Sequence, residues 1–124
     1  MYTKVLVKDL IEDGRNLIAV LQREQFPVTA AFWVKIPDSE RHRLVIASPV
    51  VKELGQLAAY QQLQTILESF PLEQLSFEDI SVLGPNDANF KALLTTALGP
   101  GFERGPSGGK FRDAAFEDAY IYYL

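Results

Sequence analysis

The stretch of residues 99–111, GPGFERGPSGGKF, holds the residue types best suited to bind a phosphate. Glycines let backbone N–H groups approach an anion, and Arg104, Lys110 and Arg112 add positive charge. A nucleotide-binding phosphate loop, however, needs glycine at the position of Arg104 and serine or threonine at that of Phe111. A phosphate loop also follows a strand and precedes a helix, whereas here a helix is expected before the loop and a strand after it. We therefore expect a mobile connection that trypsin cuts early and that binds anions weakly at most.

Acidic side chains come in pairs at the ends of expected strands: Asp38 with Glu40, Glu78 with Asp79, and Glu117 with Asp118. Two converging pairs could hold a magnesium ion, as in metal-dependent nucleases. Those enzymes commonly carry a Glu-X-Lys sequence on the same strand, and none occurs in this chain. Solvated carboxylates at strand ends are the simpler interpretation, so no metal and no other cofactor is expected.

His42 is the single histidine of a chain that has no cysteine. One imidazole without thiolates cannot form a zinc site of the usual kind. We expect His42 to be exposed at the start of a strand. The Gly-X-Ser-X-Gly elbow of serine hydrolases is also missing from the sequence, so no catalytic residue is assigned.

Aromatic side chains are the strongest binding candidates, above all Trp33, Tyr120 and Tyr122. Alternate aromatic residues on a strand can stack bases, but the net charge of −4 argues against a nucleic-acid partner, because contacts to phosphates need a surplus of Lys and Arg. Two interpretations stay open for the face of the last strand that carries Tyr120 and Tyr122. It packs under a helix, or it contacts a protein partner or a second copy.

Apolar residues recur at three-and-four spacing through residues 4–24, which predicts an amphipathic helix. Asp9 with Glu12 could instead cap a later start and leave residues 2–7 as a short strand. Gly14 costs about 1 kcal/mol relative to alanine inside a helix. Either a neighbour packs closely against it or the helix bends there.

β-Branched and aromatic residues predict a β-hairpin over residues 26–48, and Ser48 followed by Pro49 is a favourable helix start. The further elements are a helix over 49–70, a strand over 77–83, a helix over 86–98, a strand in the terminal DAYIYYL and an extra short strand near Phe111. Two strand–helix–strand connections predict parallel neighbours. The expected fold is α+β, with a single mixed β-sheet (the hairpin plus two further strands) packed by three helices.

The composition is that of an ordinary globular protein, with 124 residues, 48% of them hydrophobic and 23% charged. This length suits one domain, so we expect a single α+β domain over residues 1–124. The start of the chain lacks the pattern of a secretion signal, and no segment approaches the ~20 apolar residues that span a bilayer. Together with the absence of cysteine, this predicts a cytoplasmic protein with no membrane partner.

Four runs of the sequence carry a resemblance: FPVTAAFW, LVIASP, GPND and EDAYIY, at residues 26–33, 44–49, 84–87 and 117–122. Together they resemble a family of small uncharacterised bacterial proteins with no assigned activity. The resemblance implies a bacterial, single-domain protein. No functional residue is carried over from it.

The first functional expectation is a non-enzymatic interaction or accessory module that binds itself, as a homodimer, or another protein. Its candidate binding residues are Trp33, Tyr120, Tyr122, Arg104, Lys110 and Arg112. The alternative is a metal- or phosphate-dependent enzyme, or a nucleic-acid processing component. Its site would lie between the glycine loop, residues 99–112, and the acidic pair Glu117 and Asp118.

Overall fold

A mixed β-sheet is the centre of the fold. The computed structural model describes residues 8–35, 42–98, 112–116 and 119–123. The strands are β1 (Ala30–Lys35), β2 (His42–Ala47), β3 (Ile80–Leu83), β4 (Arg112–Phe116) and β5 (Ala119–Tyr123). Their spatial order is β3-β2-β1-β5-β4, with β2 and β3 parallel and every other pair antiparallel. The expected α+β class with a single mixed sheet is confirmed.

The expected hairpin is formed by β1 and β2, which pair from Ala30 opposite Ala47 to Lys35 opposite His42. Both strands are almost wholly buried, as expected for strands with apolar residues on both faces. β4 corresponds to the extra short strand expected near Phe111, and it pairs with β5. The sheet therefore has one more strand than the hairpin plus two.

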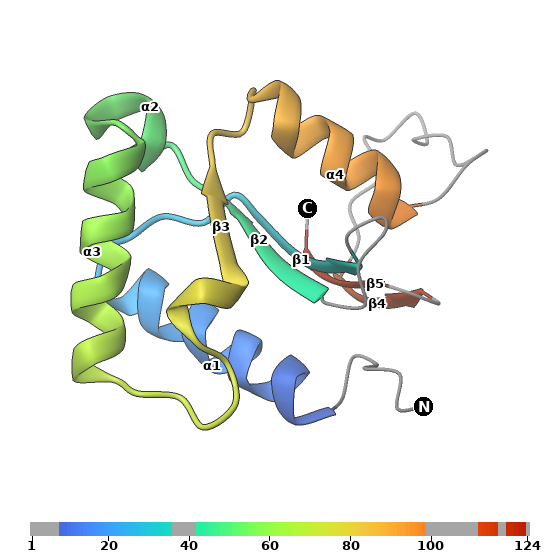
Figure 1. The fold of residues 1–124 in the computed structure, drawn as a ribbon, viewed down its shortest axis with the longest axis horizontal. Helices are drawn as coiled ribbons and strands as arrows, with labels where there is room; N and C mark the ends of the chain where they lie inside the picture. The colour runs from blue at the N-terminus through green and yellow to red at the C-terminus, as the bar shows by residue number, and fades with distance from the viewer. Residues whose placement is uncertain (1–7, 36–41, 99–111, 117–118, 124) are drawn as a thin grey trace.

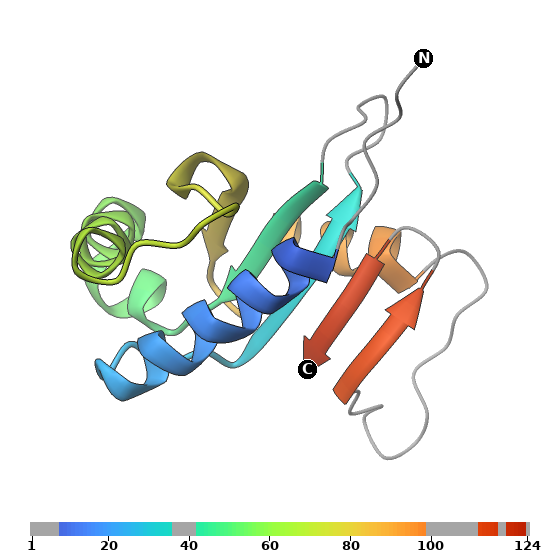
Figure 2. The same ribbon diagram turned by 90° about the horizontal axis from the view of Figure 1, so that it is seen from below.

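Helices lie on both sides of this sheet (Figures 1 and 2). α1 (Lys8–Arg23) crosses one face and α4 (Ala88–Leu98) covers the other, while α3 (Gln56–Ser69) stands beside β3 after the short α2 (Val50–Leu54). Successive strand residues alternate between two cores because strand side chains have a period of two. The core on the α1 side includes Leu17, Leu21, Trp33, Leu44, Ile46, Leu63 and Tyr122. The core on the α4 side includes Phe32, Val45, Phe90, Leu94 and Ile121.

The helix expected over residues 49–70 is two helices, α2 and α3, separated at Gly55. Gly55 has φ 92°, a conformation that residues with a side chain rarely adopt. The helix begins at Val50, one residue later than expected, with Pro49 in place of Ser48 as its N-cap residue. The Ser48 hydroxyl accepts a hydrogen bond from the Val50 N–H at 3.2 Å. The break has a consequence for Leu54, which the continuous helix would have placed in its apolar stripe. The Leu54 side chain is 58% exposed instead.

One expected pair of parallel neighbours is correct and the other is wrong. β2 and β3, joined through α2 and α3, are parallel neighbours. β3 and the last strand, β5, are not neighbours, since β5 pairs with β1. The reason lies at the free edge of β3, where side chains of α3 bind the backbone of Val82. That edge is therefore closed to a further strand.

Two element starts differ from the expected ones. The expected strand over 77–83 begins with a short 3-10 helix (Phe77–Asp79), in which Ser76 and Asp79 form a capping box. The last helix begins at Ala88, where the Asp87 carboxylate accepts a hydrogen bond from the Asn89 N–H at 2.7 Å. Asp87 therefore caps this helix in place of the expected Asn86.

Candidate functional site

Two of the aromatic candidates, Trp33 on β1 and Tyr122 on β5, lie in the core beneath α1. The indole Nε1–H of Trp33 donates a hydrogen bond to the Tyr122 hydroxyl at 2.8 Å. That hydroxyl donates in turn to the backbone carbonyl of Ile11, 2.7 Å away. Trp33 is 1% exposed and Tyr122 is 5% exposed. Trp33 and Tyr122 therefore pack under a helix, α1, which was one of the two interpretations left open for the face that carries Tyr122.

The Tyr122 hydroxyl joins elements of the fold and is not poised for proton transfer. Burial raises the pKa of Tyr122 well above its ordinary value, although the hydrogen bond from Trp33 and the charge of Arg15 act in the opposite direction. Its proton is held by Ile11, and one of its lone pairs accepts from Trp33. At neutral pH this phenol is therefore a neutral structural link.

Gly14 on α1 is where the helix comes closest to this cluster. A Cβ atom at Gly14 would fall on the Tyr122 hydroxyl and lie 3.1 Å from Nε1 of Trp33. Of the two alternatives for Gly14, close packing of a neighbour is confirmed. The missing side chain lets α1 approach the sheet near enough for Ile11 to accept the hydrogen bond from Tyr122.

Tyr120 is partly exposed to solvent. Its ring lies 5.2 Å from the ring of Tyr122 in an edge-on contact, and its hydroxyl accepts a hydrogen bond from Nη2 of Arg15 at 3.1 Å. The guanidinium carbon of Arg15 also lies 5.8 Å from the centre of the Tyr122 ring. A contact between Tyr120 and a partner stays a prediction.

Most residues of the expected phosphate or metal site lie outside the described residues. These are Arg104, Lys110, Glu117 and Asp118, together with Asp38 and Glu40. Arg112 is the first residue of β4, in a strand that is described by its backbone. Within residues 8–35, 42–98, 112–116 and 119–123, no three acidic or histidine side chains are grouped so as to hold a metal ion. The site between the glycine loop and the acidic pair stays a prediction.

His42 is buried, with 8% of its surface exposed, so the expectation of an exposed histidine was wrong. It lies on the same face of β2 as Leu44 and Ile46, two residues of the core on the α1 side. Across the hairpin it pairs with Lys35. Position at a strand end therefore did not expose this residue, whose side chain is directed to a buried face of the sheet.

A second candidate surface lies on α2 and α3, where sequence reasoning assigned no binding residue. In the described part of the chain, the large hydrophobic side chains that are exposed are Leu54 at 58% and Leu57 at 73%. We define the α3 outer face by Leu54, Leu57, Gln61, Gln62, Gln64, Thr65 and Glu68. Glu68 alone among them is charged. Charge depletion around apolar side chains is typical of the centre of protein interfaces.

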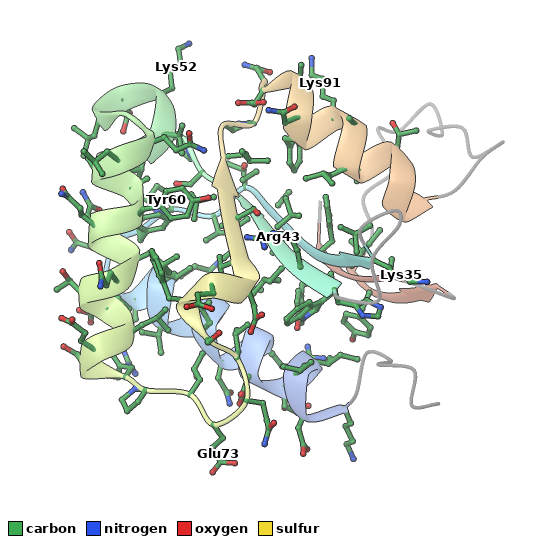
Figure 3. The ribbon with its side chains drawn as sticks, viewed as in Figure 1. Lys35, Arg43, Lys52, Tyr60, Glu73 and Lys91 are labelled. Carbon is green, nitrogen blue, oxygen red and sulfur yellow. The ribbon has the colours of Figure 1, made fainter. Side chains whose placement is uncertain are left out.

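Hydrogen bonds from the opposite side of α3 to β3 determine which way the α3 outer face points. The Tyr60 hydroxyl accepts a hydrogen bond from the backbone N–H of Val82 at 2.9 Å, and the Gln56 side-chain amide donates to the Val82 carbonyl at 3.2 Å. Figure 3 shows Tyr60 reaching from α3 towards β3. Since these bonds hold one side of the helix on the edge of the sheet, Leu57 and Gln61 are turned away from it.

A shallow hollow of about 340 Å³ lies on this surface between α3 and the end of α1. It is lined by Glu24, Ala58, Gln61, Gln62, Thr65 and Ile66. The exposed surface of α1 is different in kind, with Lys8, Asp9, Glu12, Arg15 and Arg23 among its exposed residues. The α3 outer face is therefore distinct from an ordinary solvated helix of the same molecule. The sequence signal was the QLAAYQQLQTILES run itself, in which one residue of the helix is charged.

Comparison with protein-family models, with curated proteins and with solved structures finds no match to this chain. The resemblance seen in its sequence therefore stays an expectation. In the described part of the chain, every helix is too short or too polar to cross a membrane.

Proposed function

We propose that this chain is a protein-interaction module that binds a protein partner through the α3 outer face and performs no catalysis there. The observation that carries the proposal is the exposure of Leu57, 73%, in the first turn of α3, a helix in which one residue is charged. Burying a leucine side chain contributes about 1.5–3 kcal/mol, so this position is a favourable anchor for a partner. We place its action in the bacterial cytoplasm, in line with the resemblance and the absence of cysteine.

The chemistry of the face restricts the partner. A surface that recognises its partner through charge would need several Lys, Arg, Asp or Glu side chains, and this one offers Glu68 and, in the lining of its hollow, Glu24. The matching surface is therefore apolar with uncharged hydrogen-bonding groups. Binding through such a face changes little with ionic strength, because few charges are screened.

Site-specific photo-crosslinking tests the proposal. A photoreactive amino acid is placed at Leu57 and, as a control, at Asn16, which is exposed on α1. In the cells that make the protein, we expect a defined covalent adduct from position 57 and none from position 16. Mass spectrometry then identifies the adduct, and Leu57→Glu in the unlabelled chain should abolish its ability to compete. Equal labelling from both positions, or none from position 57, contradicts the proposal.

A further inference from the structure

We infer that the α3 outer face binds a second copy of this chain, an inference that rests on the proposed function above. The face carries a projection and a recess side by side. Leu57 projects, with 73% of its surface exposed, and the hollow begins at the next residue of the same helix. Its lining has the apolar side chains of Ala58 and Ile66 and the polar ones of Glu24, Gln61, Gln62 and Thr65. A contact of this face with its own copy can therefore use both features at once.

Symmetry makes the two features complementary. Two neighbouring points on one surface are exchanged by a two-fold axis that passes midway between them. Such an axis, set between Leu57 and the hollow, puts the Leu57 side chain of each copy over the hollow of the other. The result is an isologous interface, in which each contact occurs twice.

Charge favours the same occupant. The chain has a net charge of −4, so two copies repel one another unless they meet where charges are few. The contact surface has few charges, which are Glu68 on the α3 outer face and Glu24 in the lining of the hollow. The side-chain amides of Gln61 and Gln62 each donate and accept hydrogen bonds, so they pair with the same groups of a second copy. A strongly acidic partner would find no cation among the residues of this face and its hollow.

The size of the interface sets the expected strength. Stable complexes usually bury about 800 Å² on each partner. One helix face with the short α2 is a modest contact, so we expect a weak dimer whose population rises with concentration. Sedimentation equilibrium of the purified chain over a wide concentration range measures the dimer dissociation constant directly.

Variants of Leu57 test whether the dimer uses this face. Leu57→Glu should raise the dimer dissociation constant about tenfold or more, because the substitution acts twice in a symmetric contact. Circular dichroism should be unchanged, since Leu57 is exposed. Ala19→Glu, on the exposed surface of α1, is the matched control and should leave the dissociation constant unchanged. A dimer that is unaffected by Leu57→Glu overturns the inference, as does a wild-type chain that stays monomeric at its highest soluble concentration.

Disulfide crosslinking tests the pairing of Leu57 with the hollow. The chain has no cysteine, so two single variants, Leu57→Cys and Gln62→Cys, can be mixed and oxidised without a background. We expect mixed disulfides between the two variants to form faster than disulfides of either variant with the Asn16→Cys control. Equal rates refute the pairing. Failure of these experiments removes the second copy as the partner, whereas the proposed interaction function depends on the photo-crosslinking result in cells.

Discussion

The indole N–H of Trp33 donates a hydrogen bond to the hydroxyl of Tyr122, 2.8 Å away, although 89 positions separate the two residues in the chain. The hydroxyl in turn donates a hydrogen bond to the carbonyl of Ile11 at 2.7 Å. One buried polar link therefore ties β1, β5 and α1 together. Buried polar groups of this kind stabilise a fold when each has its partner, and they are costly when one partner is removed.

Replacing Tyr122 with phenylalanine should lower the free energy of unfolding by about 1–3 kcal/mol, because the Trp33 indole loses its acceptor in a buried place. Urea unfolding followed by tryptophan fluorescence measures this, since Trp33 is the single tryptophan. Tyr120→Phe is the control. Its hydroxyl bonds to Arg15 at an exposed site, so the change should stay within about 0.5 kcal/mol. Equal stabilities of the Tyr122→Phe variant and the wild type would contradict the role given to this hydroxyl.

The stabilising effect of Tyr122 should decline at alkaline pH. Burial raises the pKa of the folded Tyr122 above its ordinary value of 10.0. Above that pH the unfolded chain loses this proton while the folded chain keeps it, so the free energy of unfolding falls by up to about 1.4 kcal/mol per pH unit. Tyr122→Phe lacks this contribution. The stability difference between wild type and variant should therefore narrow from about pH 9 to about pH 11, as measured by urea unfolding; a constant difference would show that the pKa is not raised.

Gly14→Ala should destabilise the protein by about 1–3 kcal/mol through overpacking, since its Cβ would collide with the Tyr122 hydroxyl. The intrinsic preference of helices for alanine acts in the opposite direction by about 1 kcal/mol. In the Tyr122→Phe background the penalty should shrink, because the colliding oxygen is gone. Thermal unfolding of the four chains of this double-mutant cycle measures the coupling. Asn16→Ala, at an exposed position of the same helix, should be neutral or slightly stabilising.

Tyr60→Phe should leave the backbone N–H of Val82, at the edge of β3, without its hydrogen-bond acceptor. The variant removes the acceptor of the Val82 N–H, so that amide should exchange with deuterium faster, and the free energy of unfolding should fall by about 1 kcal/mol. Hydrogen exchange followed by NMR resolves the single amide. Gln64→Ala, at an exposed position of the same helix, should leave the exchange rate of Val82 unchanged. An unchanged rate in Tyr60→Phe would mean that the side chain does not protect the strand.

Local patterns in the sequence determined much of the fold. The β1–β2 hairpin, the long helix α1 and the alternation of Tyr122 with Ile121 between two cores follow from spacing alone. These features depend on residues a few positions apart, since a period of two or of 3.6 is a property of a short segment. The same reasoning reduced Gly14 to two alternatives, of which close packing is the correct one.

Tertiary structure decided which strands meet and which helix surfaces stay open. The place of β5 beside β1 depends on competition among strand edges that are distant in the sequence, and the Tyr60 bond to Val82 removes one of those edges. The same bond sets the rotation of α3 about its axis. That rotation, with the break at Gly55, leaves Leu57 exposed on the surface proposed to bind a partner. Periodicity identifies an apolar stripe, but the direction a helix faces is fixed by contacts with residues elsewhere in the chain.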